Sequence, residues 1–212
     1  MITTKHQLYF YIAADRIMKG LAATRSIKDV ILTLIGSRRY VSGGLIMEYQ
    51  RHMRFVDYYQ NKTHRGMLDN LLRMVHKFHF DRLGLKLGFS LNPDSFGYGL
   101  VIPHYGTIVI NGDCKFGNYC VLHTSTCIAG GDKSFGNGFY LSSGAKVTGT
   151  GSYGDAVSIA ANSVANRPAV DHCLLAGMPA EVKKTHYPYW YERDGERFWN
   201  RVARIEDLRN CN

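Results

Sequence analysis

Residues 96–165 read FGYGLVIPHYGTIVINGDCKFGNYCVLHTSTCIAGGDKSFGNGFYLSSGAKVTGTGSYGDAVSIAANSVA, and a six-residue repeat runs through them. An aromatic residue followed by glycine fills one position of the repeat, and mostly aliphatic residues fill two others. The aromatic set is Phe96, Phe116, Phe135 and Tyr153, the second set is Ile102, Leu122, Leu141 and Ile159, and the third set is Ile108, Ile128, Val147 and Ala165. Three steps of six residues bring each member back over its counterpart, so the pattern predicts stacked triangular coils of a parallel β-helix.

The repeat is interrupted twice. Two extra residues fall between Ile108 and Phe116, where we expect a turn at 111–113, and one extra residue precedes Phe135. A sandwich of short antiparallel strands is the alternative interpretation, but six residues are too few for a strand and its turn. We therefore expect about four coils, with the four aromatic residues stacked on one inner face.

The residues before the repeat have a different character. Glycine is sparser there, long apolar and basic residues dominate, and their spacing predicts helices. The expected helices are 7–23, 29–35, 44–61 and 64–87. Gly88 is a plausible helix stop, and Pro93 prevents the helix from continuing.

These patterns predict an α+β fold made of three parts. The parts are a helical cap (1–90), a β-helix domain (91–184) and a C-terminal tail (185–212). The tail is rich in aromatic and charged residues, and we expect it to contain a short helix that packs on a neighbour.

Composition narrows the class of protein. The chain has 212 residues, 45% of them hydrophobic, and a formal net charge of +9 at pH 7. It contains neither a bilayer-length apolar stretch nor an N-terminal signal-peptide pattern, so we expect a cytoplasmic protein. The positive charge favours anionic partners, but no basic arm, zinc finger or RNA-binding motif accompanies it, and we predict no nucleic-acid binding.

The five cysteines form no Cys-x-x-Cys pair. Cys114, Cys120 and Cys127 recur at nearly the coil spacing, which is typical of small residues in the interior or at turns. A zinc site made by Cys127 and His123 is the alternative. We expect that the protein requires no metal.

Four short motifs suggest a family. They are IPHYGT at 102–107, IAGGD at 128–132, GAKV at 144–147 and AGMPA at 176–180. In order and spacing they resemble the hexapeptide-repeat acyltransferases, and most of all the serine acetyltransferase branch. This resemblance covers about residues 90–184. It implies a left-handed β-helix, assembly as a homotrimer or a dimer of trimers, acetyl-CoA as co-substrate, and an active site between neighbouring subunits.

The resemblance also assigns roles to residues. It implies that His104 is the general base on an acceptor hydroxyl, a role that suits imidazole because it titrates near neutral pH. A structural turn histidine is the alternative. The expected cofactor-binding residues are Gly130, Ser143, Ala161, Arg167, Gly177, Lys183 and Lys184, small where the thioester arm passes and basic where phosphates would lie. The lysines could equally be solvated surface residues.

The expected acceptor-binding residues are Tyr105, His123, Lys133 and Ser134. His123 is included because it is expected one coil away from His104, at the usual strand spacing of about 4.8 Å. It could equally be a plain exterior residue.

Two departures from the family pattern bear on the acceptor. Pro103 stands where the serine-specific enzymes have an acid, and Lys133 and Ser134 stand where they have an Arg-His pair. Both changes remove groups that hold an amino acid. We therefore predict transfer to a sugar hydroxyl in surface or capsular polysaccharide synthesis, and we expect peripheral association with membrane-linked sugar substrates.

Two other functions remain open. Serine O-acetyltransferase of cysteine biosynthesis is the alternative enzyme. A catalytically silent solenoid that binds a partner through its helical cap is the alternative outside enzymes.

Overall fold

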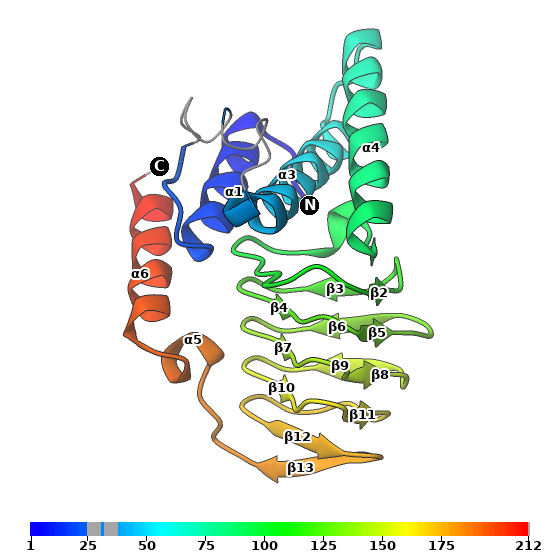
Figure 1. Ribbon diagram of the computed structural model, residues 1–212, viewed down its shortest axis with the longest axis vertical. Coiled ribbons are helices and arrows are strands. Elements are labelled where there is room, and N and C mark those ends of the chain that lie inside the picture. Colours follow the sequence, from blue (N-terminus) through cyan, green and yellow to red (C-terminus); the bar gives the residue numbers. More distant parts are fainter. Residues whose placement is uncertain (25–30, 32–37, 212) are drawn as a thin grey trace.

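The computed structural model describes residues 1–24, 31 and 38–211 (Figure 1). The expected fold class is confirmed: N-terminal helices precede a β-solenoid of about five coils, and a helix follows it. The helices are α1 (Lys5–Met18), α3 (Arg38–Asn61), α4 (Met67–Leu87), α5 (Trp190–Arg193) and α6 (Glu196–Asn210). The helix expected at 29–35 lies, apart from Ile31, outside the described residues.

The solenoid has three walls, each a ladder of short strands. Wall A consists of β1 (Phe89–Ser90), β2 (Ile108–Ile110), β5 (Thr126–Ile128), β8 (Lys146–Val147) and β11 (Val164–Ala165); wall B of β3 (Lys115–Phe116), β6 (Lys133–Phe135) and β9 (Gly151–Tyr153); wall C of β4 (Val121–Leu122), β7 (Tyr140–Leu141), β10 (Ser158–Ile159), β12 (Leu174–Gly177) and β13 (Ala180–Lys184). All pairs are parallel except β12 with β13, whose antiparallel hairpin closes the far end. A 3₁₀ turn, η1 (Pro93–Ser95), leads into the first coil.

The aromatic stack is confirmed. The rings of Phe96, Phe116, Phe135 and Tyr153 lie one above the other, with successive centroids 4.6, 4.5 and 5.0 Å apart and nearly parallel planes. The glycine that follows each ring has no room for a side chain. A Cβ on Gly117 would lie 2.7 Å from the backbone nitrogen of Asn137 in the next coil. The aromatic-glycine pair is thus dictated by the stacking of coils.

The register of wall A corrects one expectation. Ile110, rather than Ile108, pairs with Ile128, and Ile108 pairs with Thr126. The two extra residues of the first coil therefore lie before β2, in loop 103–107, and not in the turn at 111–113. The expected number of coils was also low, because β12 adds a further rung to wall C.

The helices begin and end close to their expected positions. α1 stops at Met18, earlier than expected, because Gly20 adopts a left-handed φ of 81° and the chain turns there. α4 ends at Gly88, whose left-handed φ of 80° confirms it as the helix stop. Side chains of the cap and the solenoid belong to one hydrophobic cluster, in which Tyr49 of α3 contacts Phe89 of β1.

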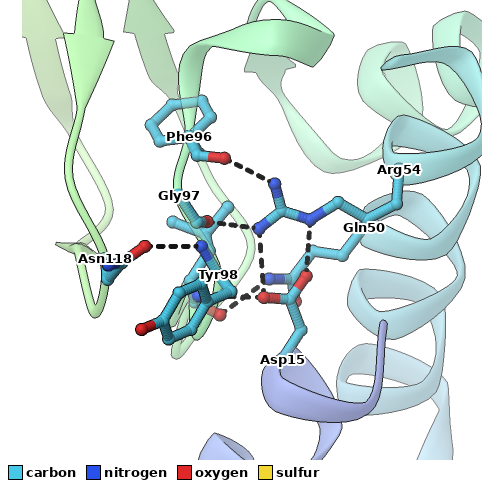
Figure 2. A network of polar contacts seen from close by, with 8 residues as sticks. Asp15, Gln50, Arg54, Phe96, Gly97, Tyr98 and Asn118 are labelled. Carbon is cyan, nitrogen blue, oxygen red and sulfur yellow. Dashed lines mark hydrogen bonds and ion pairs between the residues drawn. The ribbon is translucent and has the colours of Figure 1, made fainter. Parts of the chain in front are cut away.

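Arg54 of α3 joins the helical cap to the first coil (Figure 2). Its side chain is fully buried and forms two hydrogen bonds to the carboxylate of Asp15 in α1, at 2.9 and 3.1 Å. It also donates to the carbonyl oxygens of Phe96 and Gly97, both at 2.7 Å. No coil lies above these carbonyls, so the guanidinium takes the place of the missing strand.

Two more hydrogen bonds complete this junction. Asp15 accepts a hydrogen bond from the backbone N–H of Leu100 at 3.0 Å, and Gln50 donates to the Leu100 carbonyl at 2.8 Å. Both backbone groups of one residue are thereby satisfied by helix side chains, as buried backbone groups must be.

Loss of the Arg54 side chain should strongly lower the free energy of unfolding. Arg54→Met leaves the Asp15 carboxylate and two carbonyls buried without their donor, so we expect a loss of about 3–5 kcal/mol in the free energy of unfolding. Urea denaturation measures it. Arg51→Met is the matched control: Arg51 pairs with Glu48 but is 31% exposed, and its loss should cost at most about 1 kcal/mol. Equal losses from the two variants would contradict this account of the junction.

The C-terminal tail contains the expected helix, and it packs on its own chain. From β13 the chain runs back along the solenoid to α6, which lies beside α1 (Figure 1). The Trp190 indole N–H donates to the Tyr119 carbonyl at 2.7 Å, and Arg201 donates to the Met18 carbonyl at 2.9 Å. The tail therefore links the cap to the turns between walls B and C.

The outward face of α4 is apolar. Seven of its large hydrophobic side chains are between 45% and 90% exposed, and we call them the α4 stripe. They are Met67, Leu68, Leu71, Met74, Val75, Phe78 and Leu85. None of the helices among the described residues combines the length and hydrophobicity that a bilayer span requires.

Candidate active site

His104 projects from a loop that stands out from the solenoid. The two extra residues of loop 103–107 push His104 and Tyr105 outward, and both side chains are exposed. Lys19, at the end of α1, fixes the start of the loop by donating to the carbonyl oxygens of Ile102 and Pro103, both at 3.1 Å. Burial lowers the pKa of the Lys19 ammonium from its ordinary value.

α4 fixes the other end of the same loop. The backbone N–H of Gly106 donates to the Leu87 carbonyl, and that of Ile108 donates to the Gly88 carbonyl, both at 2.9 Å. An exposed imidazole is thus presented on a backbone held at both ends by the cap. Such a backbone suits a group that must meet a substrate in a defined position.

His123 lies directly beside this loop. It directly follows β4 (Val121–Leu122), and since Val121 pairs with Val101, it lies one coil away from the start of the loop. Its Nε2 lies 2.8 Å from the hydroxyl of Tyr140. Burial lowers the pKa of His123, and the charge of His104 lowers it further. Both effects favour the uncharged form of the His123 imidazole, which lies within electrostatic reach of His104.

The tail adds an arginine and an acid to this cluster. The guanidinium of Arg193 lies over the Tyr140 ring at 5.1 Å and over the Tyr187 ring at 5.0 Å. Its Nε donates to Asp194 at 2.7 Å. The Asp194 carboxylate acts on His123 in the opposite sense to burial, because its negative charge raises the pKa of that imidazole.

Three of the expected cofactor-binding residues share a ridge with His104. The turns between walls C and A stack along the solenoid, and we call this column the His104 ridge. Gly144 N–H donates to the Thr124 carbonyl at 3.1 Å, and Asn162 N–H to the Ser143 carbonyl at 3.0 Å. The exposed residues Ser143, Ala161 and Gly177 lie on this ridge, below His104.

Three other predicted residues lie elsewhere. Gly130 and Arg167 are exposed in the turns between walls A and B, which we call the second ridge. Ser134 is on wall B, where its hydroxyl bonds to that of Ser152 at 2.8 Å. Within one chain, none of these residues is on the ridge that carries His104.

Lys133 does not fit its predicted role. Its side chain is buried, with 3% of the residue exposed, and its ammonium donates to the carbonyl oxygens of Ala129 and Gly131 at 2.6 and 3.1 Å. The lysine thus holds its own turn together. The acceptor-binding role expected for Lys133 stays a prediction, and the bonding of its ammonium within its own turn argues against it.

The basic pair at the end of the solenoid lies on β13. Lys183 is half-exposed and pairs with Glu181 at 2.9 Å, and the Lys184 ammonium lies 5.8 Å from the centre of the Tyr187 ring. Both remain accessible to an anionic ligand, since surface ion pairs are weak.

The cysteines have no cluster of ligands around them. Cys114 and Cys120 are buried as expected, and Cys127 is half-buried on wall A. Within the described part of the chain, no three His, Cys, Asp or Glu side chains lie close enough to hold a metal ion.

The helical cap contains a cavity that is separate from the histidine cluster. A cavity of about 580 Å³ lies in the helical cap, lined among others by Tyr9, Ala13, Met47 and Phe55. Among its described lining residues, none comes from loop 103–107.

Known structures share this fold. A serine acetyltransferase of Neisseria gonorrhoeae superposes with a TM-score of 0.56 at 18% identity, over 84% of this chain and 68% of that one. A serine acetyltransferase in complex with CoA gives 0.55 at 16% identity, over 84% and 70%. The serine acetyltransferase of Brucella abortus strain S19, in complex with coenzyme A, gives 0.51 at 15% identity, over 86% and 83%. At these identities the likeness establishes the fold alone. No protein-family model and no curated protein matches the chain.

Sequence reasoning missed several members of the cluster. Tyr140 could have been found, since it precedes Leu141 of the repeat and so faces outward on wall C, one coil from His123. Lys19, Arg193 and Asp194 carry no comparable signal, because they come from helices outside the repeat.

The pKa of His123 reports on this cluster. Replacing Asp194 by Asn removes a negative charge that raises this pKa, so we expect it to fall further below its ordinary value. Replacing His104 by Ala removes a positive charge that lowers it, so we expect it to rise. Imidazole ¹H–¹⁵N correlation spectra recorded across pH measure both shifts. No change in either variant would show that the three groups are not neighbours.

Proposed function

We propose that this protein is an acetyl-CoA-dependent O-acetyltransferase and that His104 is its general base. The observation that carries the proposal is the placement of His104 on a loop that both Lys19 and the end of α4 hold in position. A solenoid needs no such loop for its own stacking. An exposed, rigidly mounted imidazole next to a second, neutral one is an arrangement suited to proton transfer.

The reaction transfers an acetyl group from sulfur to oxygen. His104 accepts the proton of the acceptor hydroxyl while that oxygen attacks the thioester carbonyl. The tetrahedral oxyanion collapses, the carbon–sulfur bond breaks, and the imidazolium gives its proton to the leaving CoA thiolate. His123, uncharged and hydrogen-bonded to Tyr140, would orient the acceptor or the base without competing for the proton.

The His104 ridge suits the thioester arm of acetyl-CoA. Its exposed small residues, Ser143, Ala161 and Gly177, allow the arm to approach the backbone closely. Lys183 and Lys184 lie near the far end of wall C, where they could meet the phosphates.

L-Serine is the first candidate for the acceptor. The structural neighbours named above are serine acetyltransferases. A further structure, that of the Neisseria gonorrhoeae enzyme in complex with serine, gives a TM-score of 0.56 at 19% identity. Serine O-acetyltransferase is thus favoured over the sugar acceptor that the sequence suggested.

A sugar hydroxyl remains the second candidate, and a specific observation favours it. Pro103 replaces an acid, Ser134 is on another wall, and the ammonium of Lys133 is committed to its own turn. The expected clamp for a free amino acid is therefore missing from this chain. A surface or capsular polysaccharide precursor would also suit the net charge of +9. A cytoplasmic location and the absence of nucleic-acid binding stay predictions.

His104→Ala tests the proposal directly. We expect turnover with acetyl-CoA and either acceptor class to fall by roughly 10²–10⁴, because general-base assistance is lost. The affinity for acetyl-CoA should stay unchanged, since His104 addresses the acceptor. Release of CoA followed with a thiol reagent, and calorimetric binding of acetyl-CoA, measure the two quantities. A variant with near-normal turnover would refute the role of His104.

The proposed enzyme acts as a homotrimer or a dimer of trimers. The α4 stripe supports self-association, because Met67, Leu71, Met74 and Phe78 recur at intervals of four, three and four residues and Leu85 follows seven later. That spacing is the seam of a coiled coil. Assembly would also bring the second ridge of one copy, with Gly130 and Arg167, to the His104 ridge of another.

Substitutions on the stripe should reduce the size of the assembly. We expect Leu71→Glu/Phe78→Glu to lower the molar mass measured by light scattering, because buried charges would separate the helices. Val170→Glu is the matched control, since Val170 is also exposed but belongs to the solenoid. A wild-type protein that is monomeric at micromolar concentration would contradict the proposal.

A further inference from the structure

The contact between the tail and wall C offers a binding group that the repeat does not encode. Arg193 stands at the centre of this contact, held between the rings of Tyr140 and Tyr187. Its Nη1 also lies 3.4 Å from the hydroxyl of Ser158 on β10. The planar guanidinium is thus fixed in orientation by aromatic faces and by wall C.

The arginine is fixed but not enclosed. Its side chain is 25% exposed, and that of its partner Asp194 is 32% exposed. A guanidinium has five N–H donors in a planar fork, of which Asp194, Ser158 and Tyr187 take up only part. It can therefore bind an added carboxylate or phosphate through charge-assisted hydrogen bonds.

Arg193 lies close enough to the two histidines to contact a ligand bound there. Arg193 contacts Tyr140, Tyr140 contacts His123, and His123 senses the charge of His104. These groups form a contiguous patch on the outside of wall C, next to the loop that carries the base. A ligand whose hydroxyl reaches His104 could extend across this patch toward the arginine.

We propose that Arg193 binds an anionic oxygen group of the acceptor, a carboxylate or a phosphate. The proposal rests on the proposed function, since it names the substrate class of the same site. It gives the chain the clamp that Lys133 cannot supply, because the ammonium of Lys133 is buried in its turn. An amino acid would present the carboxylate, and a phosphorylated sugar would present the phosphate.

Asp194 limits the strength of this site. Its carboxylate occupies Nε of Arg193 at 2.7 Å, so an anionic ligand meets both an attractive cation and a repulsive anion. Removing the acid while keeping the arginine should therefore strengthen anion binding. Stronger anion binding after removal of the acid would indicate that Arg193 recognises a ligand. A purely structural role, in which Arg193 only attaches the tail to wall C, does not predict it.

Calorimetric binding with matched ligands tests the proposal. L-Serine is compared with L-serinamide, and N-acetylglucosamine 1-phosphate with N-acetylglucosamine, each with the wild-type full chain and its variants. We expect one ligand that carries the carboxylate or phosphate to bind better than its counterpart without that group. Arg193→Ala should weaken the binding of that anionic-group ligand by roughly ten- to a hundred-fold and change the binding of its counterpart little. Arg193→Lys should fall between, and Asp194→Asn should bind the anionic ligand more tightly.

Arg197→Ala is the control, since Arg197 also stacks on an aromatic ring, that of Phe198, but lies outside the patch on α6. Its binding should match the wild type, and thermal melts verify that all variants are folded. If Arg193→Ala lowers the melting temperature but preserves the preference for the anionic ligand, the arginine is only a fastening and the proposal is overturned. Equal binding, by the wild type, of each ligand and its counterpart without the carboxylate or phosphate also overturns it.

Transfer assays separate this inference from the proposed function. Arg193-dependent binding without acetyl transfer to either ligand would refute the enzyme and keep the binding site. Acetyl transfer whose KM for the anionic acceptor is the same in the wild type and Arg193→Ala would keep the enzyme and refute the site.

Discussion

The first coil of the solenoid has an edge that no further coil covers, and the fold depends on how that edge is closed. Parallel strands present rows of backbone groups that must find partners when buried. The cap supplies them from side chains: Arg54 binds the carbonyl oxygens of Phe96 and Gly97, and Asp15 accepts from Leu100 (Figure 2). The buried ion pair between Arg54 and Asp15 holds these two helices in the geometry that this requires.

The same closure positions the candidate site. Lys19 follows directly on α1 and binds the carbonyls at the start of loop 103–107, while the end of α4 binds the other side of that loop. The conformation around His104 is therefore a property of the cap as much as of the solenoid. This coupling explains why a helical cap stands at the end of the solenoid where the exposed histidine lies.

The tail covers another part of the solenoid and also brings side chains to the candidate site. It covers the turns between walls B and C, where Trp190 and Glu206 bind groups of Tyr119. In doing so it carries Arg193 and Asp194 to the side of His123 and Tyr140. The patch around His104 thus draws on the cap, two coils and the tail. Its open side faces outward, where another copy of the chain could complete it.

The solenoid and its aromatic stack followed from the sequence alone, because coils that repeat at a fixed interval require the same residue type at each level. The position of loop 103–107 did not follow from the sequence. It depends on the pairing of Ile110 with Ile128, which is set by the register of the strands in wall A. The burial of Lys133 and the arrival of Arg193 at wall C were likewise decided only by tertiary structure. Contacts such as that of Arg54 with Asp15, 39 positions apart, leave no periodic trace, because each joins segments with unrelated local patterns.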